Sequence, residues 1–143
     1  MGGTEIFIPI RYMISLSVIV MIFVTILRLK VIYLDKKVSG ENYRHPEFPE
    51  GSNILKNGQR NLANLFEFPI LFYALCIMIY VTGNVDETFV KLAWYFLFFR
   101  IAHSIYHIFF NHIILGGFPA RAMLFVPSLI IIIMMTWRFY GMI

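Results

Sequence analysis

Four long apolar runs constrain what this chain can fold into more than any other feature of its sequence. Each approaches the roughly 20 residues that an apolar helix needs to cross a bilayer, and the last contains the stretch SLIIIIMM. Only 14% of the residues are charged, against about a quarter in a typical soluble domain. We therefore predict an all-α integral membrane protein, a single domain over residues 1–143, with four transmembrane helices at about residues 6–28, 57–80, 87–111 and 119–140.

The one sizeable polar segment, residues 30–56, is predicted to be an extended loop because its HPEFPEGSN stretch holds two prolines and a glycine. The side of the membrane with this loop and the last connection holds most of the lysines and arginines: Arg28, Lys30, Lys36, Lys37, Arg44, Lys56, Arg60 and Arg121. The other side holds Arg11, Lys91 and Arg138. The positive-inside rule then predicts that loop 30–56 is cytoplasmic and that both termini lie across the membrane.

Charge and cysteine content exclude several classes of protein. The net charge of +4 is small and dispersed along the chain, so we expect no nucleic-acid partner. A single cysteine, Cys76, rules out an internal disulfide framework and a CxxC metal or redox site. His103 and His107 have the i, i+4 spacing of a metal-binding pair, but no HExxH pattern accompanies them, so no metal site is predicted.

Two of the predicted spans carry polar residues on one helical face. In the second span the residues are three, four and three positions apart, which is one face of a helix: Asn57, Arg60, Asn64 and Glu67. In the third span they are three, four and four positions apart: Arg100, His103, His107 and Asn111. Because ionisable groups inside a membrane are costly, such residues indicate a functional site by default.

The short turn VTGNVD between these spans predicts that they pack antiparallel. Glu67 and Arg100 then lie at similar depth, and we predict a buried ion pair between them. The other polar residues on these two helical faces would line a cavity toward the cytoplasm, with Arg28 and Arg121 at its mouth. Pro69 is predicted to kink the second span beside Glu67.

Two interpretations of the stripes stay open at this point. Polar side chains hold membrane helices together through interhelical hydrogen bonds. Alternatively, the positively charged groups, which lie at successive depths from the bilayer midplane to the mouth of the cavity, would bind an anionic ligand. Arginine binds carboxylates through two parallel hydrogen bonds.

The second-span pattern, Arg60-x3-Asn64-x2-Glu67 followed by Pro69, resembles the second-helix signature of the MAPEG superfamily, the membrane-associated proteins of eicosanoid and glutathione metabolism. The segment RIAHSIYH, from Arg100 to His107, resembles the third-helix signature of its prostaglandin E synthase branch. The length, the four spans and the long first loop also fit. The nearest likeness is to small bacterial members, which implies a bacterial inner membrane.

The resemblance implies a homotrimer that binds glutathione, as a co-substrate, between adjacent subunits on the cytoplasmic side. Carried over by position, the glutathione-binding residues would be Arg28 (from the neighbouring subunit), Arg60, Asn64, Glu67, His103 and His107. Arg121 would be catalytic and stabilise the thiolate. The chain departs from the family pattern where His107 replaces a tyrosine and Ala63 an arginine, and its connection NHIILGGFPA is longer and apolar.

The leading hypothesis is therefore a MAPEG-type protein with glutathione transferase or peroxidase activity on lipophilic electrophiles. The first alternative is a non-catalytic protein of the same fold, either a lipid-binding scaffold or an accessory subunit of a larger membrane complex. The second is a small transporter or proton-relay subunit, with Glu67, Arg100 and His103 as the relay. Membrane lipids are expected partners in every case.

Overall fold

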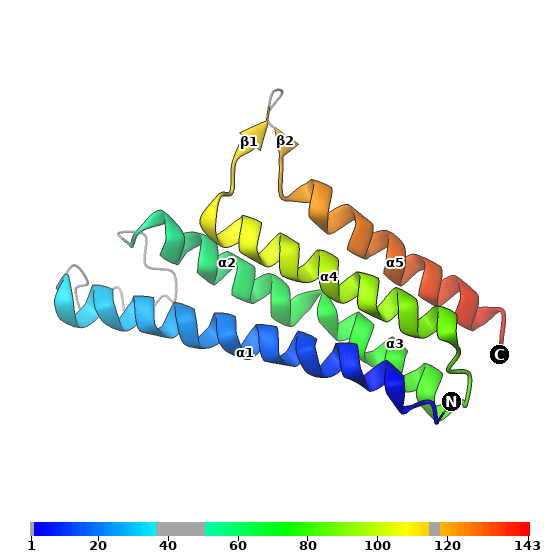
Figure 1. The fold of residues 1–143 in the computed structure, drawn as a ribbon. Coiled ribbons are helices and arrows are strands. Elements are labelled where there is room, and N and C mark those ends of the chain that lie inside the picture. The colour runs from blue at the N-terminus through cyan, green and yellow to red at the C-terminus, as the bar shows by residue number, and fades with distance from the viewer. Residues whose placement is uncertain (1, 37–50, 115–117) are drawn as a thin grey trace.

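A computed structural model describes residues 2–36, 51–114 and 118–143, and four helical segments run side by side in it (Figure 1). A short 3₁₀ turn, Thr4–Ile6, precedes the first long helix, α1 (Phe7–Leu29), which continues into a π-helical turn, Lys30–Leu34. The main elements, in chain order, are α1 (Phe7–Leu29), α2 (Asn53–Glu67), α3 (Pro69–Val81), α4 (Glu87–Phe109), β1 (Ile113–Ile114), β2 (Phe118–Pro119) and α5 (Ala122–Tyr140). The two termini lie at the same end of the bundle.

Three helical segments of the described chain are long and apolar enough to cross a membrane: Thr4–Leu34, Asn53–Val81 and Ala122–Tyr140. The fourth, α4, has the same 23-residue length as α1 but does not reach that hydropathy. It lies against α1, α2 and α5, and it turns polar side chains toward these neighbours. The prediction of a helical membrane bundle is confirmed, with three of its four helices meeting the criteria for a span.

Some predicted boundaries are wrong. The second span begins at Asn53 rather than near Asn57, because the side chain of Ser52 accepts a hydrogen bond from the backbone N–H of Leu55 at 3.3 Å and caps the helix. The predicted loop 30–56 also loses Lys30–Leu34 to helix. Of that loop, residues 37–50 lie outside the described residues.

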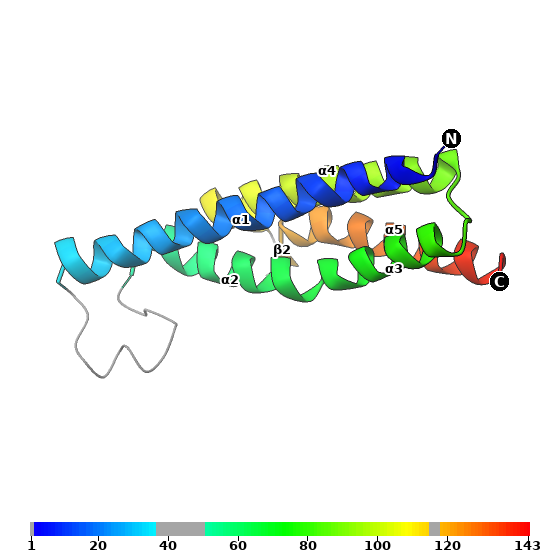
Figure 2. The ribbon, with the colours of Figure 1, turned by 90° about the horizontal axis from the view of Figure 1, so that it is seen from below.

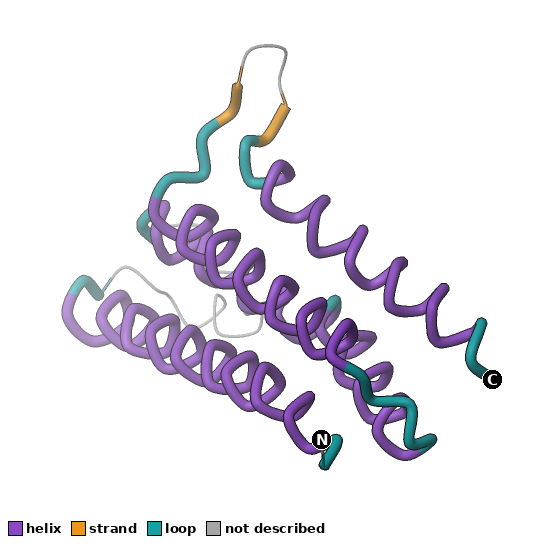
Figure 3. Tube along the Cα trace, turned by 45° about the vertical axis from the view of Figure 1, so that its right-hand side comes forward, coloured by secondary structure: helices purple, strands orange, loops and turns teal. Residues whose placement is uncertain are grey.

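The last predicted span begins late, at Ala122, because residues before it form a short antiparallel strand pair that the sequence did not predict. Pro119 pairs with Ile113 in this hairpin, so its predicted place in the first helical turn is wrong. Figure 3 shows the hairpin where α4 ends and α5 begins.

The second span breaks where the sequence predicted a kink. α2 ends at Glu67, α3 starts at Pro69, and Phe68 joins them. Proline has no N–H to donate to the carbonyl of Leu65, so the helical hydrogen-bond ladder is interrupted there. Figure 2 shows α2 and α3 as successive parts of one span. The break places Phe68 at the boundary between a polar and an apolar part of the bundle.

At the termini end, the turn between α3 and α4 is closed by Gly83, whose φ of 71° suits glycine. Asp86 then caps α4 by accepting a hydrogen bond from the backbone N–H of Phe89 at 2.8 Å. The same carboxylate accepts a hydrogen bond from the guanidinium of Arg138 in α5. Partial burial raises the pKa of Asp86, but the hydrogen bonds and positive charge of these partners outweigh it, and the net pKa is lowered.

Candidate polar site between α2, α4 and α5

Two hydrogen bonds set the register of α2 against α4. The side-chain amide of Asn57 donates to the carbonyl of Ile108 at 3.4 Å, and the guanidinium of Arg100 donates to the carbonyl of Asn64 at 3.4 Å. The two helices are therefore antiparallel, as predicted, with the amino-terminal part of α2 beside the carboxyl-terminal part of α4. We call this interface between α2 and α4 the polar seam. It holds the polar residues Asn57, Asn64, Arg100, His103 and His107.

At the hairpin end of the seam, Asn111 makes hydrogen bonds that connect α2, the end of α4 and the start of α5. Its φ of 42° places it in the left-handed region, where it ends α4, and its N–H donates to the carbonyl of Tyr106 at 2.9 Å. Its side-chain amide donates to Oδ1 of Asn57 at 2.8 Å, and its own Oδ1 accepts from Nη1 of Arg121 at 2.6 Å. Asn111 thus fixes the guanidinium of Arg121 relative to α2 and α4.

Arg100 is fully buried, but its contacts are not those predicted. Its guanidinium lies over the rings of Phe68 at 5.3 Å and Phe125 at 5.8 Å. Glu67 is exposed, and neither residue takes part in an ion pair within the described chain. The predicted Glu67–Arg100 ion pair is therefore wrong for the single chain.

Helical rotation explains this outcome. At about 100° per residue, Glu67 is turned by about 60° from Asn64, whose carbonyl faces Arg100, and so lies on the outer side of α2. Glu67 and Arg100 lie at a similar depth in the bundle, but equal depth does not make an ion pair when the two side chains do not point toward each other.

A pocket of about 260 Å³ opens between α2, α4 and α5, lined by Asn64, His103, Arg121, Ala122 and Phe125. Three of the residues predicted for the site therefore come together: Asn64, His103 and Arg121. His103 is 2% exposed, and its ring lies 5.9 Å from that of Phe125. The pocket thus joins an amide, an imidazole and a guanidinium to an aromatic wall.

His107 lies one turn beyond His103, with the two ring centroids 5.5 Å apart. It is buried and lies outside the pocket lining, although three arginines are close enough to act on it electrostatically: Arg121, Arg60 and Arg100. Three arginines therefore lie near this imidazole, and clustered positive charge favours anions.

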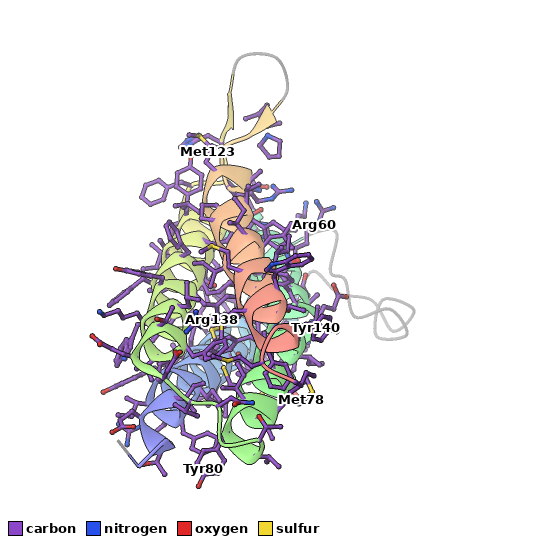
Figure 4. The ribbon with its side chains drawn as sticks, turned by 90° about the vertical axis from the view of Figure 1, so that its right-hand side faces the viewer. Arg60, Met78, Tyr80, Met123, Arg138 and Tyr140 are labelled. Atoms are coloured by element: carbon purple, nitrogen blue, oxygen red, sulfur yellow. The ribbon has the colours of Figure 1, made fainter. Side chains whose placement is uncertain are left out.

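The other predicted site residues lie outside this pocket. Arg60 is exposed on α2 (Figure 4), although its carbonyl accepts a hydrogen bond from the amide of Asn64 at 3.1 Å. Glu67, about two turns farther along α2, is also exposed. Arg28 is partly buried in the last turn of α1. In one copy of the chain, these three residues do not line the pocket with Asn64, His103 and Arg121.

The seam also contains a second group of polar residues, which was not predicted from the sequence. Asn61 and Ser104 fall at the same level in the register set by Asn57 and Arg100, and both are buried. Both polar atoms of the Asn61 amide, Oγ of Ser104 and both ring nitrogens of His107 lack a hydrogen-bond partner within the described chain. The spacing of Asn57, Asn61 and Asn64, four and three residues apart, is the signal that would have revealed the facing side of α2.

No group of three or more histidine, cysteine, aspartate or glutamate side chains is placed to hold a metal ion in the described parts of the chain. The donors of the seam are amides, imidazoles, a hydroxyl and guanidinium groups. Such a set suits hydrogen bonding to an anionic organic ligand.

Comparison with known proteins gives one assignment. A family model described as the MAPEG family matches residues 10–141, nearly the whole chain. Neither the curated proteins nor the solved structures yield a match to this chain. The matched range includes every helix from α2 to α5, most of α1, and all the residues of the polar seam. The chain belongs to the MAPEG family.

Proposed function

We propose that the protein is a glutathione-dependent transferase or peroxidase that acts on lipophilic electrophiles. The observation that supports this proposal best is the pocket in which Asn64, His103 and Arg121 meet. It combines a fixed positive charge with neutral hydrogen-bonding groups, as an anionic peptide thiol requires. It also adjoins the apolar surfaces of α5, from which a membrane-dissolved substrate arrives.

In this proposal Arg121 stabilises the thiolate. A guanidinium beside a thiol lowers the pKa of that thiol and raises the fraction of the nucleophilic form. Asn111 holds Arg121 by a hydrogen bond of 2.6 Å, so the charge is already in place before the ligand binds. Attack of the thiolate on an electrophilic carbon forms a C–S bond while the bond from that carbon to its leaving group breaks, and the leaving group departs with the electron pair. Attack on a lipid peroxide forms an S–O bond, breaks the O–O bond and releases the alcohol after protonation, and a second glutathione then reduces the sulfenic acid to give the disulfide and water. Asn64 and His103 hold polar groups of the peptide by hydrogen bonds.

The proposal includes a homotrimer. Arg60 and Glu67 are exposed on α2 in the single chain, and charged side chains that face lipid are costly. A neighbouring copy that packs against this face would shield both residues and bring its own Arg28 toward the pocket. The ligand would then lie between subunits, on the cytoplasmic side of a bacterial inner membrane, and Arg60 and Glu67 would join the site.

Thermal unfolding of the detergent-purified protein, with and without glutathione, tests the binding step. Ligand at about 100 times its dissociation constant should stabilise the folded protein by about 2.7 kcal/mol. We expect the shift in unfolding temperature to disappear in Arg121→Gln and to be partly kept in Arg121→Lys. Arg11→Gln, which removes an exposed arginine of α1 at the termini end, is the matched control and should keep the full shift.

A second readout separates binding from chemistry. If Arg121 stabilises a thiolate, the bound peptide should show thiolate absorbance in the ultraviolet at neutral pH, and Arg121→Gln should abolish it. Binding without this absorbance would contradict the catalytic role of Arg121. No shift at saturating glutathione would reject the glutathione site and favour a non-catalytic scaffold or an accessory subunit of a larger membrane complex.

A further inference from the structure

The connection between α4 and α5 is unusually apolar for a segment that leaves a membrane bundle. Residues 110–120, FNHIILGGFPA, contain no lysine, arginine, aspartate or glutamate. The connection at residues 30–56, at the same end of the bundle, carries charges of both signs. We expect charged residues in a connection that is exposed to water and an apolar composition in a connection that contacts lipid.

The described residues of this region expose their apolar side chains. Ile113 is 73% exposed, Met123 62%, and Phe109 and Phe110 55% each. Met123 lies at the base of the hairpin (Figure 4). Phe109 continues an exposed stripe along α4 that includes Phe98 and Ile105, spaced seven and four residues apart. Because the chain spans a membrane, this stripe faces lipid, and the apolar surface at the hairpin is continuous with it.

The hairpin also starts at a depth where α1 is still apolar. The ring of Phe109, the last residue of α4, lies 6.0 Å from that of Phe23 in α1. α1 continues for six more residues to Leu29, about 9 Å of helix. Ile26 and Leu29 are 59% and 48% exposed in that stretch. The base of the hairpin is therefore level with apolar turns of α1 rather than beyond them.

The direction of the hairpin agrees with this depth. Figures 1 and 3 show it pointing to the side of the bundle, across the helix axes rather than along them. Its backbone groups pair within the hairpin, in the register of Ile113 with Pro119, and the N–H of Ala120 donates to the carbonyl of His112 at 3.1 Å. Internal pairing of this kind lowers the cost of placing a backbone where water is scarce.

Aromatic and imidazole rings gather where the hairpin leaves α4. Tyr106 stacks on Phe110 with ring centroids 5.7 Å apart, and the rings of both lie 6.3 Å from that of His112. Oη of Tyr106 and Nδ1 of His112 are 3.5 Å apart. Rings that combine an apolar body with a polar tip are enriched at the boundary between lipid and water.

From these observations we propose that the α4–α5 hairpin lies in the boundary layer of the membrane, with the side chains of Phe109, Phe110 and Ile113 among the lipids of the leaflet. Its partner is the lipid of the bilayer that the protein spans. The hairpin precedes Arg121 directly, so it sets the level of the pocket mouth at the lipid–water boundary. This inference does not depend on what the pocket binds.

Site-directed spin labelling of the full chain in lipid vesicles tests the proposal. Cys76 is the only cysteine and is buried, so Cys76→Ala provides a background for Ile113→Cys carrying a nitroxide. Oxygen partitions into lipid and a nickel chelate stays in water. We expect the oxygen-to-nickel collision ratio at Ile113→Cys to approach that of Phe98→Cys, the lipid control, and to exceed that of Asp35→Cys, the water control.

A ratio at Ile113→Cys equal to that of Asp35→Cys would overturn the proposal, because the hairpin would then lie in water. Low collision rates with both reagents would also overturn it, in favour of a second copy or another protein covering the hairpin. Phe110→Cys supplies a second label in the same surface. If one variant fails to fold, as judged by its unfolding temperature, the other gives the same decision.

Discussion

The two halves of the bundle differ in what they bury. The termini half, on the α3 side of Phe68, buries mainly apolar side chains, among them Phe72, Phe89, Phe96, Ile79 and Met135, all fully buried. The hairpin half, on the α2 side, buries Asn61, Arg100, His103, Ser104 and His107. Buried polar groups without partners lower stability, while close packing holds membrane helices together. We therefore expect the packing of the termini half to stabilise the bundle and to offset the destabilising effect of the buried polar groups in the hairpin half.

The largest effect is expected in the termini half. Phe96 is fully buried and stacks on Phe72 with ring centroids 4.2 Å apart. We expect Phe96→Ala to destabilise the protein by about 3 kcal/mol, the low end for such truncations because the hydrophobic driving force is small in lipid. Unfolding in mixed micelles with rising denaturing detergent measures it. A loss below about 1 kcal/mol would show that this half is not the source of stability.

A smaller effect is expected at the hairpin end of the polar seam. Asn111→Ala removes hydrogen bonds to Asn57 and Arg121 and forces alanine into a left-handed conformation. We expect a loss of about 2 kcal/mol, since a hydrogen bond to a charged group contributes roughly 1.5–3 kcal/mol. Asn111→Gly is the matched control, because glycine keeps the backbone conformation and loses only the side chain. If Asn111→Gly is as stable as the original protein, the side-chain hydrogen bonds contribute nothing.

The stability contributed by Asp86, in the turn at the termini end, should depend on pH in the acid range. The pKa of Asp86 is lowered in the folded protein, so its stabilising contribution is present above the unfolded pKa of about 3.9. It is lost as the pH falls through the lower folded pKa. We expect Asp86→Ala to cost about 1 kcal/mol at neutral pH, mostly for the lost helix cap, since exposed ion pairs contribute little.

Unfolding temperatures measured across this acid range check the titration. The difference between the original protein and Asp86→Ala should shrink toward low pH. Asp86→Asn keeps a capping side chain and should be less destabilised than Asp86→Ala. A difference that is constant with pH would contradict the role of the carboxylate.

The smallest change is expected at Asn61, where the amide is buried and has no partner within the described chain. Leucine has the same branching and the same number of side-chain heavy atoms as asparagine and removes that cost, so we expect Asn61→Leu to give a gain of no more than about 1 kcal/mol. Asn57→Leu is the matched comparison, because it breaks a real hydrogen bond to Asn111 and should destabilise. A marked loss in Asn61→Leu would mean that water or a ligand bonds to this amide in the membrane.

The helices themselves could be predicted from the sequence because their apolar runs and breakers are local signals. The break at Pro69, the turn at Gly83 and the antiparallel order of α2 and α4 follow from such signals. The hairpin of Ile113–Ile114 with Phe118–Pro119 could not be predicted this way, since strands of two residues are too short to show an alternation of apolar and polar residues.

The candidate site was only partly predictable. Asn64, His103 and Arg121 meet in one pocket, but Glu67 does not reach Arg100. Spacing gives a face for each helix and a depth for each residue, whereas the rotation of one helix against the next depends on packing between them. Aromatic partners such as Phe68 and Phe125, which cover Arg100, carry no sequence signal that separates them from lipid-facing rings.

The break at Phe68 has a consequence for how the protein fits bilayers of different thickness. α2 is held to α4 by Asn57 and Asn64, while α3 lacks the ladder hydrogen bond that Pro69 cannot donate. We therefore expect hydrophobic mismatch to be absorbed by a change in the tilt of α3 alone. Helix tilts measured by solid-state NMR in bilayers of short and long acyl chains would show this, and equal tilting of α2 would refute it. A pocket built on α2, α4 and α5 would then keep its shape while the membrane around it thins or thickens.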